Sequence, residues 1–119
     1  MARILVVDDE PDQRFLLRRS FTRAGHEVTE AGDGAAALRV IRESPPDLVV
    51  TDMMMPVMDG AELIRCLRSE PATAGIPILV TSGDGHLAKN VDAVVPKSDP
   101  LRRLVEVADD LLTEGRGLH

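Results

Sequence analysis

The chain has 119 residues, of which 44% are hydrophobic, and this is enough for a single domain with one core. Its net charge of -6 at pH 7 does not favour binding to nucleic acid or to an anionic membrane, so we expect a protein partner. The single cysteine, Cys66, excludes an internal disulfide. The sequence contains no apolar run of membrane-spanning length and no signal-peptide pattern, so we expect a cytoplasmic location.

Five segments have the composition of β-strands. Four of them are short apolar runs rich in β-branched residues, which is typical of buried parallel strands. They cover residues 3–7, 48–51, 76–80 and 91–95. The fifth, Glu27–Ala31, alternates apolar and polar residues, so we expect it at the edge of the sheet, where it is only half covered.

Segments with helical periodicity separate these strands. The first begins near Pro11, which suits the first turn of a helix, and ends before Gly25. Its apolar face contains Leu17 and Phe21. A second helix is expected over residues 34–43, because a pair of prolines follows it.

Two more helices follow in the second half of the chain. One begins after Gly60, and the other follows the N-cap candidates Ser98 and Asp99. The apolar residues of the last helix have the i, i+3, i+4, i+7 spacing of a buried stripe. They are Leu101, Leu104, Val105, Ala108, Leu111 and Leu112. We therefore expect one domain over residues 1–114 and a disordered tail over residues 115–119.

The alternation of strands and helices predicts an α/β fold, in which helices cover both faces of a parallel sheet. Ligands of such sheets bind beyond the carboxyl ends of the strands. Four of the predicted strands have polar side chains at or directly after this end. These side chains are Asp8, Asp9, Glu10, Asp52, Thr81, Ser82 and Lys97. We expect the sheet to gather them around one crevice.

Several carboxylates in one crevice repel one another, and a cation is needed to keep them ionised together. Mg²⁺ suits such a site, because it binds one or two carboxylates, retains water and accepts phosphate oxygens as further ligands. An aspartate beside Mg²⁺ can attack a phosphoryl group. Lys97 would then stabilise the charge of the transition state, and Thr81 would donate its hydroxyl. This reasoning leaves open which aspartate is the nucleophile.

Four sequence motifs together resemble the signature of response-regulator receiver domains of two-component systems, most closely the single-domain, chemotaxis-regulator-like type. The motifs are ILVVDDEP, DLVVTDMMMPVMDG, PILVTS and VVPKS, in that order and at predicted strand ends. The resemblance covers essentially the whole chain. It implies a five-stranded parallel, doubly wound sheet with the flavodoxin-like strand order 2-1-3-4-5 and helices on both faces.

The resemblance also implies roles for the acidic residues. Asp52 matches the phosphoacceptor of the family, which also belongs to the Mg²⁺ site. Asp9 matches the direct Mg²⁺ ligand, and Asp8 matches the acid that reaches the metal through water. Met54 matches the position whose backbone carbonyl completes the metal site.

Two further residues match positions that act on the phosphoryl group. Thr81 corresponds to the switch hydroxyl of the family, and Lys97 corresponds to the lysine that binds the phosphoryl group. By implication, a sensor histidine kinase or a phosphotransfer protein donates the phosphoryl group, and phosphorylation changes the surface that a downstream protein binds. The chain would then be no conventional enzyme, since it would catalyse only its own phosphorylation and dephosphorylation.

The sequence departs from the family pattern at several positions. Val94 stands where an aromatic switch residue is usual, and only residues 86–90 remain for the fourth helix, which is too short to be stable alone. Met54 and Gly83 occupy positions that tune dephosphorylation in the family. Neither side chain can orient water through a polar group, so we expect slow autodephosphorylation.

These departures leave a second function open. A pseudo-receiver would bind a protein partner without being phosphorylated, and Val94 together with the short fourth helix is compatible with it. The intact acids, Thr81 and Lys97 favour the phosphoacceptor. A Mg²⁺-dependent phosphatase is a weaker alternative, since enzymes of that type usually have a cap domain and acids separated by one residue.

Overall fold

The computed structural model describes residues 2–83 and 88–117 of the chain, and strands and helices alternate through them. The strands are β1 (Arg3–Val7), β2 (Glu27–Ala31), β3 (Leu48–Asp52), β4 (Ile78–Ser82) and β5 (Ala93–Pro96). The helices are α1 (Pro11–Arg23), α2 (Gly34–Glu43), α3 (Gly60–Ser69) and α4 (Leu101–Gly117). This order of elements confirms the predicted α/β fold.

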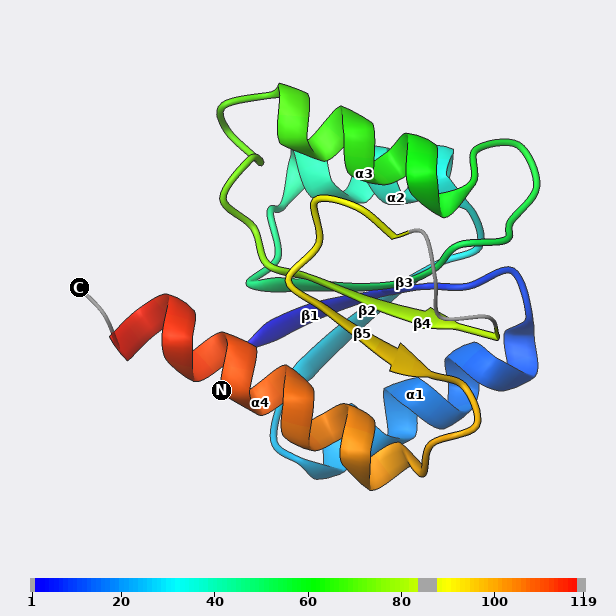
Figure 1. Ribbon diagram of the computed structural model, residues 1–119, viewed down its shortest axis with the longest axis vertical. Helices are drawn as coiled ribbons and strands as arrows, with labels where there is room; N and C mark the ends of the chain where they lie inside the picture. Colours follow the sequence, from blue (N-terminus) through cyan, green and yellow to red (C-terminus); the bar gives the residue numbers. More distant parts are fainter. Residues whose placement is uncertain (1, 84–87, 118–119) are drawn as a thin grey trace.

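The five strands form one parallel sheet with the order β2-β1-β3-β4-β5, as expected. β2 lies at the edge, and its alternating residues are exposed and half-buried, as its sequence predicts. The chain proceeds from β1 to one side of the sheet and then returns to place β3 on the other side of β1 (Figure 1). The order of the strands therefore reverses between β1 and β3, where α/β sheets bind ligands.

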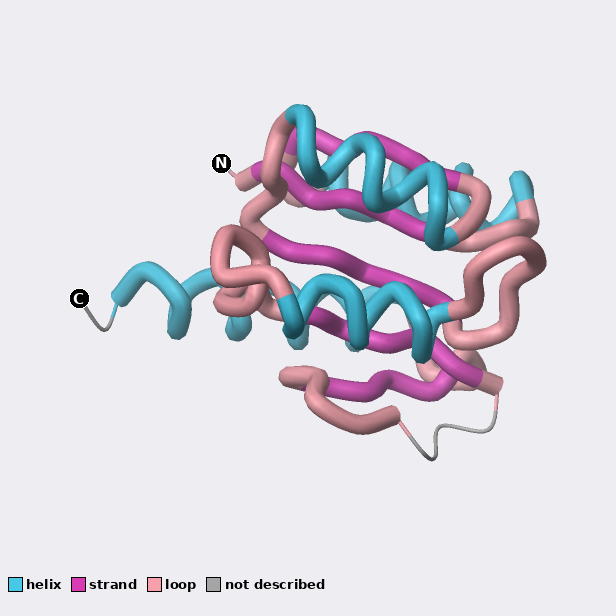
Figure 2. Tube along the Cα trace, turned by 90° about the horizontal axis from the view of Figure 1, so that it is seen from above, coloured by secondary structure: helices cyan, strands magenta, loops and turns pink. Residues whose placement is uncertain are grey.

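Two helices cover each face of the sheet. α1 and α4 lie on one face, and α2 and α3 lie on the other (Figure 1). Figure 2 shows from above how the strands run side by side across the molecule. Successive residues of a strand point to opposite faces, so Ile4 and Val6 pack toward α1 and α4, whereas Leu5 and Val7 pack toward α2 and α3.

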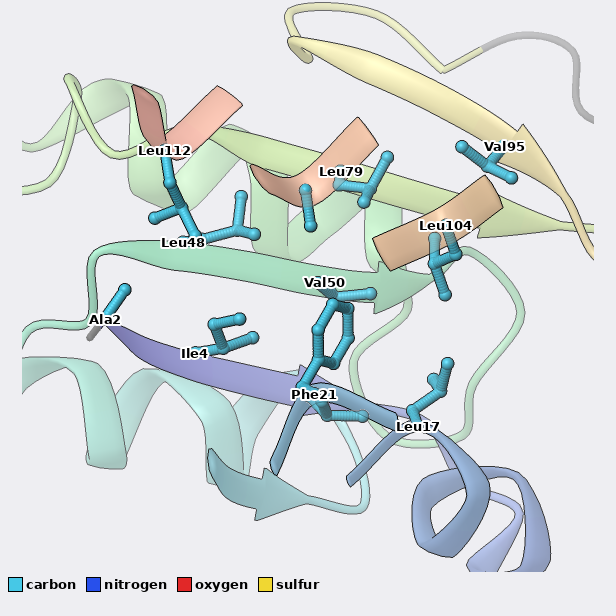
Figure 3. Packing of buried hydrophobic residues seen from close by; sticks show 12 residues of the cluster. Ala2, Ile4, Leu17, Phe21, Leu48, Val50, Leu79, Val95, Leu104 and Leu112 are labelled. Atoms are coloured by element: carbon cyan, nitrogen blue, oxygen red, sulfur yellow. The ribbon is translucent and has the colours of Figure 1, made fainter. Parts of the chain in front are cut away.

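The core between the sheet and the helices α1 and α4 is centred on Phe21, which is fully buried. Figure 3 shows Phe21 and Leu17 of α1 packed among side chains of β1, β3 and α4. A buried aromatic ring of this size removes a large apolar area from water. This contact holds α1 against the sheet, directly after the loop that contains Asp8 and Asp9.

Short polar side chains and glycine define where the helices begin and end. Asp33 caps α2 by accepting a hydrogen bond from the backbone N–H of Ala36 at 2.8 Å. Asp59 caps α3 in the same way, by accepting from the N–H of Glu62 at 2.9 Å. Gly25 follows α1 with a φ of 96°, a left-handed conformation that glycine adopts without steric cost.

The last two strands begin two residues later than their apolar runs predict. β4 begins at Ile78 because Ile76 belongs to a turn, in which its N–H is bonded to the carbonyl of Thr73. β5 begins at Ala93 because Asp92 is used as a cap, with its carboxylate accepting from the N–H of Ile78 at 2.8 Å. Each apolar run therefore contains strand residues together with partly buried residues that precede the strand.

The last helix begins at Leu101, the first residue of its predicted apolar stripe, and Pro100 separates it from the N-cap candidates Ser98 and Asp99. It continues to Gly117, three residues into the expected tail, and the rest of that tail lies outside the described residues. Helix ends commonly vary by one or two residues. In residues 2–83 and 88–117, no helix is long and apolar enough to cross a membrane.

The connection from β4 to β5 contains the segment in which a short fourth helix is expected. Its described residues, 88–92, contain no helix, and the first part of the segment expected to be too short lies outside the described residues. Arg68 of α3 holds this connection. Its guanidinium donates to the carbonyl of Asn90 at 2.9 Å and to the Asp92 carboxylate at 2.9 Å. The Arg68 side chain therefore holds residues 90–92 of this connection in place.

Candidate functional site

The predicted acidic residues meet at the carboxyl ends of β1 and β3. Asp8 and Asp9 directly follow β1, and Asp52 is the last residue of β3. One ligand oxygen from each of the three lies within 4.8 Å of the other two. Asp8 and Asp52 are buried, whereas Asp9 is exposed at the mouth of the crevice. We call these three residues the acidic cluster.

The two carboxylate oxygens of Asp52 have different surroundings. Oδ1 accepts hydrogen bonds from the backbone N–H groups of Met53 at 2.7 Å and Met54 at 3.4 Å. Oδ2 accepts from Lys97 Nζ at 3.0 Å. Asp52 is only 5% exposed, so these contacts orient its carboxylate within the crevice. Because the carboxylate is already oriented, its reaction with an electrophile does not require a further loss of side-chain entropy.

Lys97 brings a positive charge to the acidic cluster. Its backbone N–H donates to the carbonyl of Ser82 at 3.0 Å, which places it directly after the β4–β5 pairing. Besides Asp52, its Nζ lies 3.7 Å from Asp8 Oδ2 and 3.8 Å from Glu10 Oε1. Partial burial lowers the pKa of Lys97, but the hydrogen bond to Asp52 and the surrounding carboxylates outweigh it and raise the pKa. Lys97 is therefore firmly cationic.

Asp8 is the most deeply buried member of the acidic cluster, with 0% of its surface exposed. Burial raises the pKa of its carboxyl. The hydrogen bond from the N–H of Glu10 and the charge of Lys97 lower this pKa, but burial outweighs them. The negative charges of Asp52 and Asp9 add to this increase. The backbone N–H of Glu10 donates to Oδ1 at 2.9 Å, whereas Oδ2 is buried and has no hydrogen-bond partner in the described part of the chain.

An unsatisfied carboxylate oxygen within a group of three acids fits a divalent cation. Such an oxygen costs free energy unless a donor or a metal ion compensates it. The donors available are carboxylate oxygens, which suit the hard cation Mg²⁺ and not a soft transition metal. The acidic cluster therefore has the composition and the spacing for Mg²⁺. Met54, two residues after Asp52, lies beside the cluster through its own backbone N–H.

Thr81 lies next to the acceptor candidate in the sheet. The register of β3 and β4 pairs Thr81 with Asp52, and the register of β4 and β5 pairs it with Val95. Thr81 is only 3% exposed. A small hollow of about 20 Å³ adjoins Thr81 and Lys97. It holds about one water molecule and is too small for an organic cofactor.

The loop after Asp52 is shaped by a close contact at Gly60. A Cβ atom added there would lie 2.4 Å from the carbonyl oxygen of Asp52 and 2.7 Å from Met53 Cα. The Gly60 N–H donates to the carbonyl of Met53 at 2.9 Å. Only glycine allows α3 to begin this close to the end of β3. The loop between them exposes Met54 to solvent.

Sequence reasoning missed Arg14. It comes from the second turn of α1 and reaches back to the carbonyl of Asp8, which its Nη1 contacts at 2.5 Å. Arginine is common on exposed helix faces, and no local pattern distinguishes this one from Arg18, its neighbour one turn later. Only the packing of α1 against β1 and β2 shows the difference.

Comparison with known proteins identifies the family. Residues 4–99 match the family described as the response regulator receiver domain. Response regulator MprA from Mycobacterium sp. (strain KMS) is 39% identical over 116 residues, which cover 98% of this chain and 50% of MprA. This chain therefore spans about half the length of that relative.

Solved structures agree with this result. The signal receiver domain of a signal transduction histidine kinase from Syntrophus aciditrophicus superposes with a TM-score of 0.90 at 25% identity, over 100% of this chain and 96% of that one. Response regulator protein TrrA from Thermotoga maritima, in complex with Mg(2+)-BeF, superposes with a TM-score of 0.85 at 32% identity, over 93% of this chain and 99% of TrrA. The chain belongs to the response regulator receiver domains, which are signalling domains of two-component systems.

Proposed function

We propose that the protein is a phosphoacceptor switch, in which Asp52 accepts a phosphoryl group in a Mg²⁺-dependent reaction. One observation carries this proposal. The Asp52 carboxylate is fixed by backbone N–H groups on one oxygen and by Lys97 on the other, and two further acids lie beside it. A cation site next to an oriented nucleophile is the arrangement that phosphoryl transfer requires.

In the proposed reaction, one carboxylate oxygen of Asp52 forms a bond to phosphorus. The bond between phosphorus and the donor atom breaks, and its electron pair leaves with the donor. Lys97 stays cationic and stabilises the negative charge on the phosphoryl oxygens. Thr81, beside Asp52 in the sheet, would donate its hydroxyl to one of these oxygens.

We assign the metal site to Asp8, Asp9, Asp52 and the backbone carbonyl of Met54. When bound, Mg²⁺ would supply the positive charge that lets the acids and a phosphoryl group share the crevice. We assign Asp52 as the nucleophile, because its carboxylate is held by backbone N–H groups on one oxygen and by Lys97 on the other. TrrA, a structural neighbour solved in complex with Mg(2+)-BeF, supports Mg²⁺ as the metal.

The phosphoryl donor in this proposal is a sensor histidine kinase or a phosphotransfer protein in the cytoplasm. A similar receiver domain that belongs to a signal transduction histidine kinase supports it. Thr81 links the site to the rest of the sheet, since its strand β4 pairs with β5. A shift of Thr81 toward the phosphoryl group would therefore alter the surface around β4 and β5, where we expect the downstream protein to bind.

A pseudo-receiver that binds its partner without phosphorylation is the second candidate. Two observations support this candidate. Val94, which replaces the usual aromatic switch residue, is half-buried against the core, and residues 88–92 contain no helix. The complete acidic cluster and the ion pair of Lys97 with Asp52 favour the phosphoacceptor. Two buried acids and an exposed one repel one another, and a cation that compensates this repulsion serves phosphoryl transfer directly.

Incubation with acetyl phosphate tests the proposal directly. We expect intact mass spectrometry to detect one added phosphoryl group in the presence of Mg²⁺ and none after chelation. Asp52→Asn should abolish the adduct, whereas Asp110→Asn, an exposed aspartate on α4, should leave it unchanged. An unmodified wild-type protein under all conditions would refute the phosphoacceptor and leave the pseudo-receiver.

A further inference from the structure

The peptide between Asp8 and Asp9 connects two members of the acidic cluster. Asp8 is held on the N-terminal side of this peptide, where its own N–H donates to the carbonyl of Ala31 at 3.1 Å. Asp9 is exposed, and in the described part of the chain no hydrogen bond or ion pair holds its carboxylate. The direction of the Asp9 side chain therefore depends on how its backbone is oriented.

Arg14 fixes the carbonyl of this peptide. Its Nη1 donates to the Asp8 carbonyl oxygen at 2.5 Å, and its Nε donates to Glu30 Oε1 on β2 at 3.3 Å. The Arg14 side chain is only 21% exposed, so it is packed in one orientation between α1 and the sheet. Because the peptide bond is planar, fixing its carbonyl also fixes its N–H and the Cα of Asp9.

Arg18 offers a natural comparison on the same helix. It also pairs with Glu30, through Nη1 and Oε2 at 3.0 Å, but its side chain is 59% exposed. In the described residues no bond joins Arg18 to Asp8 or Asp9. The two arginines thus share a charge and a partner, and only Arg14 contacts the backbone of the acidic cluster.

We propose that Arg14 is a positioning residue for the metal site, which orients the Asp8–Asp9 peptide so that the Asp9 carboxylate faces Asp8 and Asp52. The proposal rests on the proposed Mg²⁺-dependent function. Residues that orient metal ligands from outside the coordination sphere commonly change metal affinity by roughly ten- to a hundredfold. Arg14 acts in this way through a backbone carbonyl.

Because Arg14 is positively charged, positioning of the metal ligands and simple electrostatic repulsion of Mg²⁺ predict opposite changes in Mg²⁺ affinity when Arg14 is removed. A cation close to the acidic cluster repels Mg²⁺, so its removal by itself would strengthen metal binding. Loss of positioning would weaken it. The two effects therefore differ in sign, and the direction of the change in Mg²⁺ affinity decides between them.

The test is a Mg²⁺ titration at constant ionic strength, followed by backbone amide NMR shifts, with no phosphodonor present. We expect Arg14→Ala to weaken Mg²⁺ binding about tenfold and Arg18→Ala to change it by less than about twofold. Arg14→Lys keeps the charge but cannot donate to Asp8 and Glu30 in a fork. We expect the Mg²⁺ affinity of Arg14→Lys to lie between that of Arg14→Ala and that of the wild type.

A fallback variant and the rate of phosphorylation extend this test. Arg14→Lys serves as the main variant if Arg14→Ala does not fold, because the lysine stem can still pack between α1 and β2. In the folded variant, the rate of modification by acetyl phosphate should be slow at low Mg²⁺ and return toward the wild-type rate at saturating Mg²⁺. A change in nucleophile chemistry would instead lower the rate at every Mg²⁺ concentration.

The possible outcomes separate this proposal from the one on which it rests. Unchanged or tighter Mg²⁺ binding in Arg14→Ala and Arg14→Lys, with a normal phosphoryl adduct in the wild type, overturns the role of Arg14 alone. A wild-type protein that binds no Mg²⁺ overturns both proposals. Equal weakening in Arg14→Ala and Arg18→Ala would assign the effect to their shared partner Glu30, and would likewise contradict positioning by Arg14.

Discussion

Met54 follows the proposed acceptor by two positions, and its side chain is 80% exposed. A polar side chain at this position could orient water for attack on the phosphorus atom, but a thioether is a poor hydrogen-bond acceptor. Gly83, two residues after Thr81, is also exposed and provides no side chain. On the proposed function, neither Met54 nor Gly83 can therefore assist hydrolysis of a phosphoryl group on Asp52 through a polar side chain.

We predict that the phosphorylated protein hydrolyses slowly, over minutes or longer. General-base assistance by a positioned side chain is worth roughly 10²–10⁴-fold, so Met54→Glu should shorten the lifetime at least severalfold. Val57→Gln, on the same exposed loop, serves as the control. Loss of the adduct is followed by intact mass after removal of acetyl phosphate. A wild-type lifetime of seconds would contradict the prediction.

At the scale of secondary structure, the approach of α3 to the end of β3 shapes the loop around Asp52. Asp59 caps α3, and Gly60 allows the helix to begin against the carbonyl of Asp52. Both features lie in the motif MDG, so the sequence indicates a turn there. The contact with Asp52 is visible only in the folded chain, because the two residues belong to different elements.

We predict that Gly60→Ala destabilises the protein by about 1–3 kcal/mol, because the added methyl group must displace backbone atoms of Asp52 or Met53. The same displacement should slow phosphorylation of Asp52. Gly75→Ala is the matched control, since a Cβ there meets no atom within 4 Å, and its effect should be below about 1 kcal/mol. Urea denaturation gives the stabilities. Equal stability of the two variants would contradict the steric explanation.

Over the whole molecule, the acidic cluster weakens the fold in the absence of a cation. The pKa of Asp8 is raised by burial, so the folded protein binds the Asp8 proton more tightly than the unfolded chain does. The free energy of unfolding of the metal-free protein then falls as pH rises from the ordinary carboxyl pKa through the raised one.

We predict that Asp8→Asn raises the free energy of unfolding of the metal-free protein at pH 7 by an amount on the order of 1 kcal/mol. The advantage should vanish at a pH below the ordinary carboxyl pKa, where Asp8 is protonated in both states. Thermal unfolding at several pH values measures it, with Asp110→Asn as control. Mg²⁺ should stabilise the wild type more than Asp8→Asn. A variant less stable than the wild type at pH 7 would refute the prediction.

The sequence alone determined the α/β class, the edge position of β2 and the presence of acids at the strand ends. These features follow from local patterns, because burial on one or both faces sets the spacing of apolar residues within each element. The resemblance in the four motifs added the strand order, and the structure confirms it. The late starts of β4 and β5 were not predictable, since they depend on the hydrogen bond between Thr73 and Ile76 and on the contact between Asp92 and Ile78, which form only in the folded chain.

Only the tertiary structure decided how the site residues meet. Lys97 bonds to Asp52 across 45 residues of sequence, and Arg14 contacts the carbonyl of Asp8 although nothing in its sequence neighbourhood distinguishes it from Arg18. Such contacts depend on the register of parallel strands and on the packing of helices against the sheet. The pattern of apolar residues in a strand or helix shows which of its faces is buried. The distance between two long side chains depends instead on how all the elements pack together.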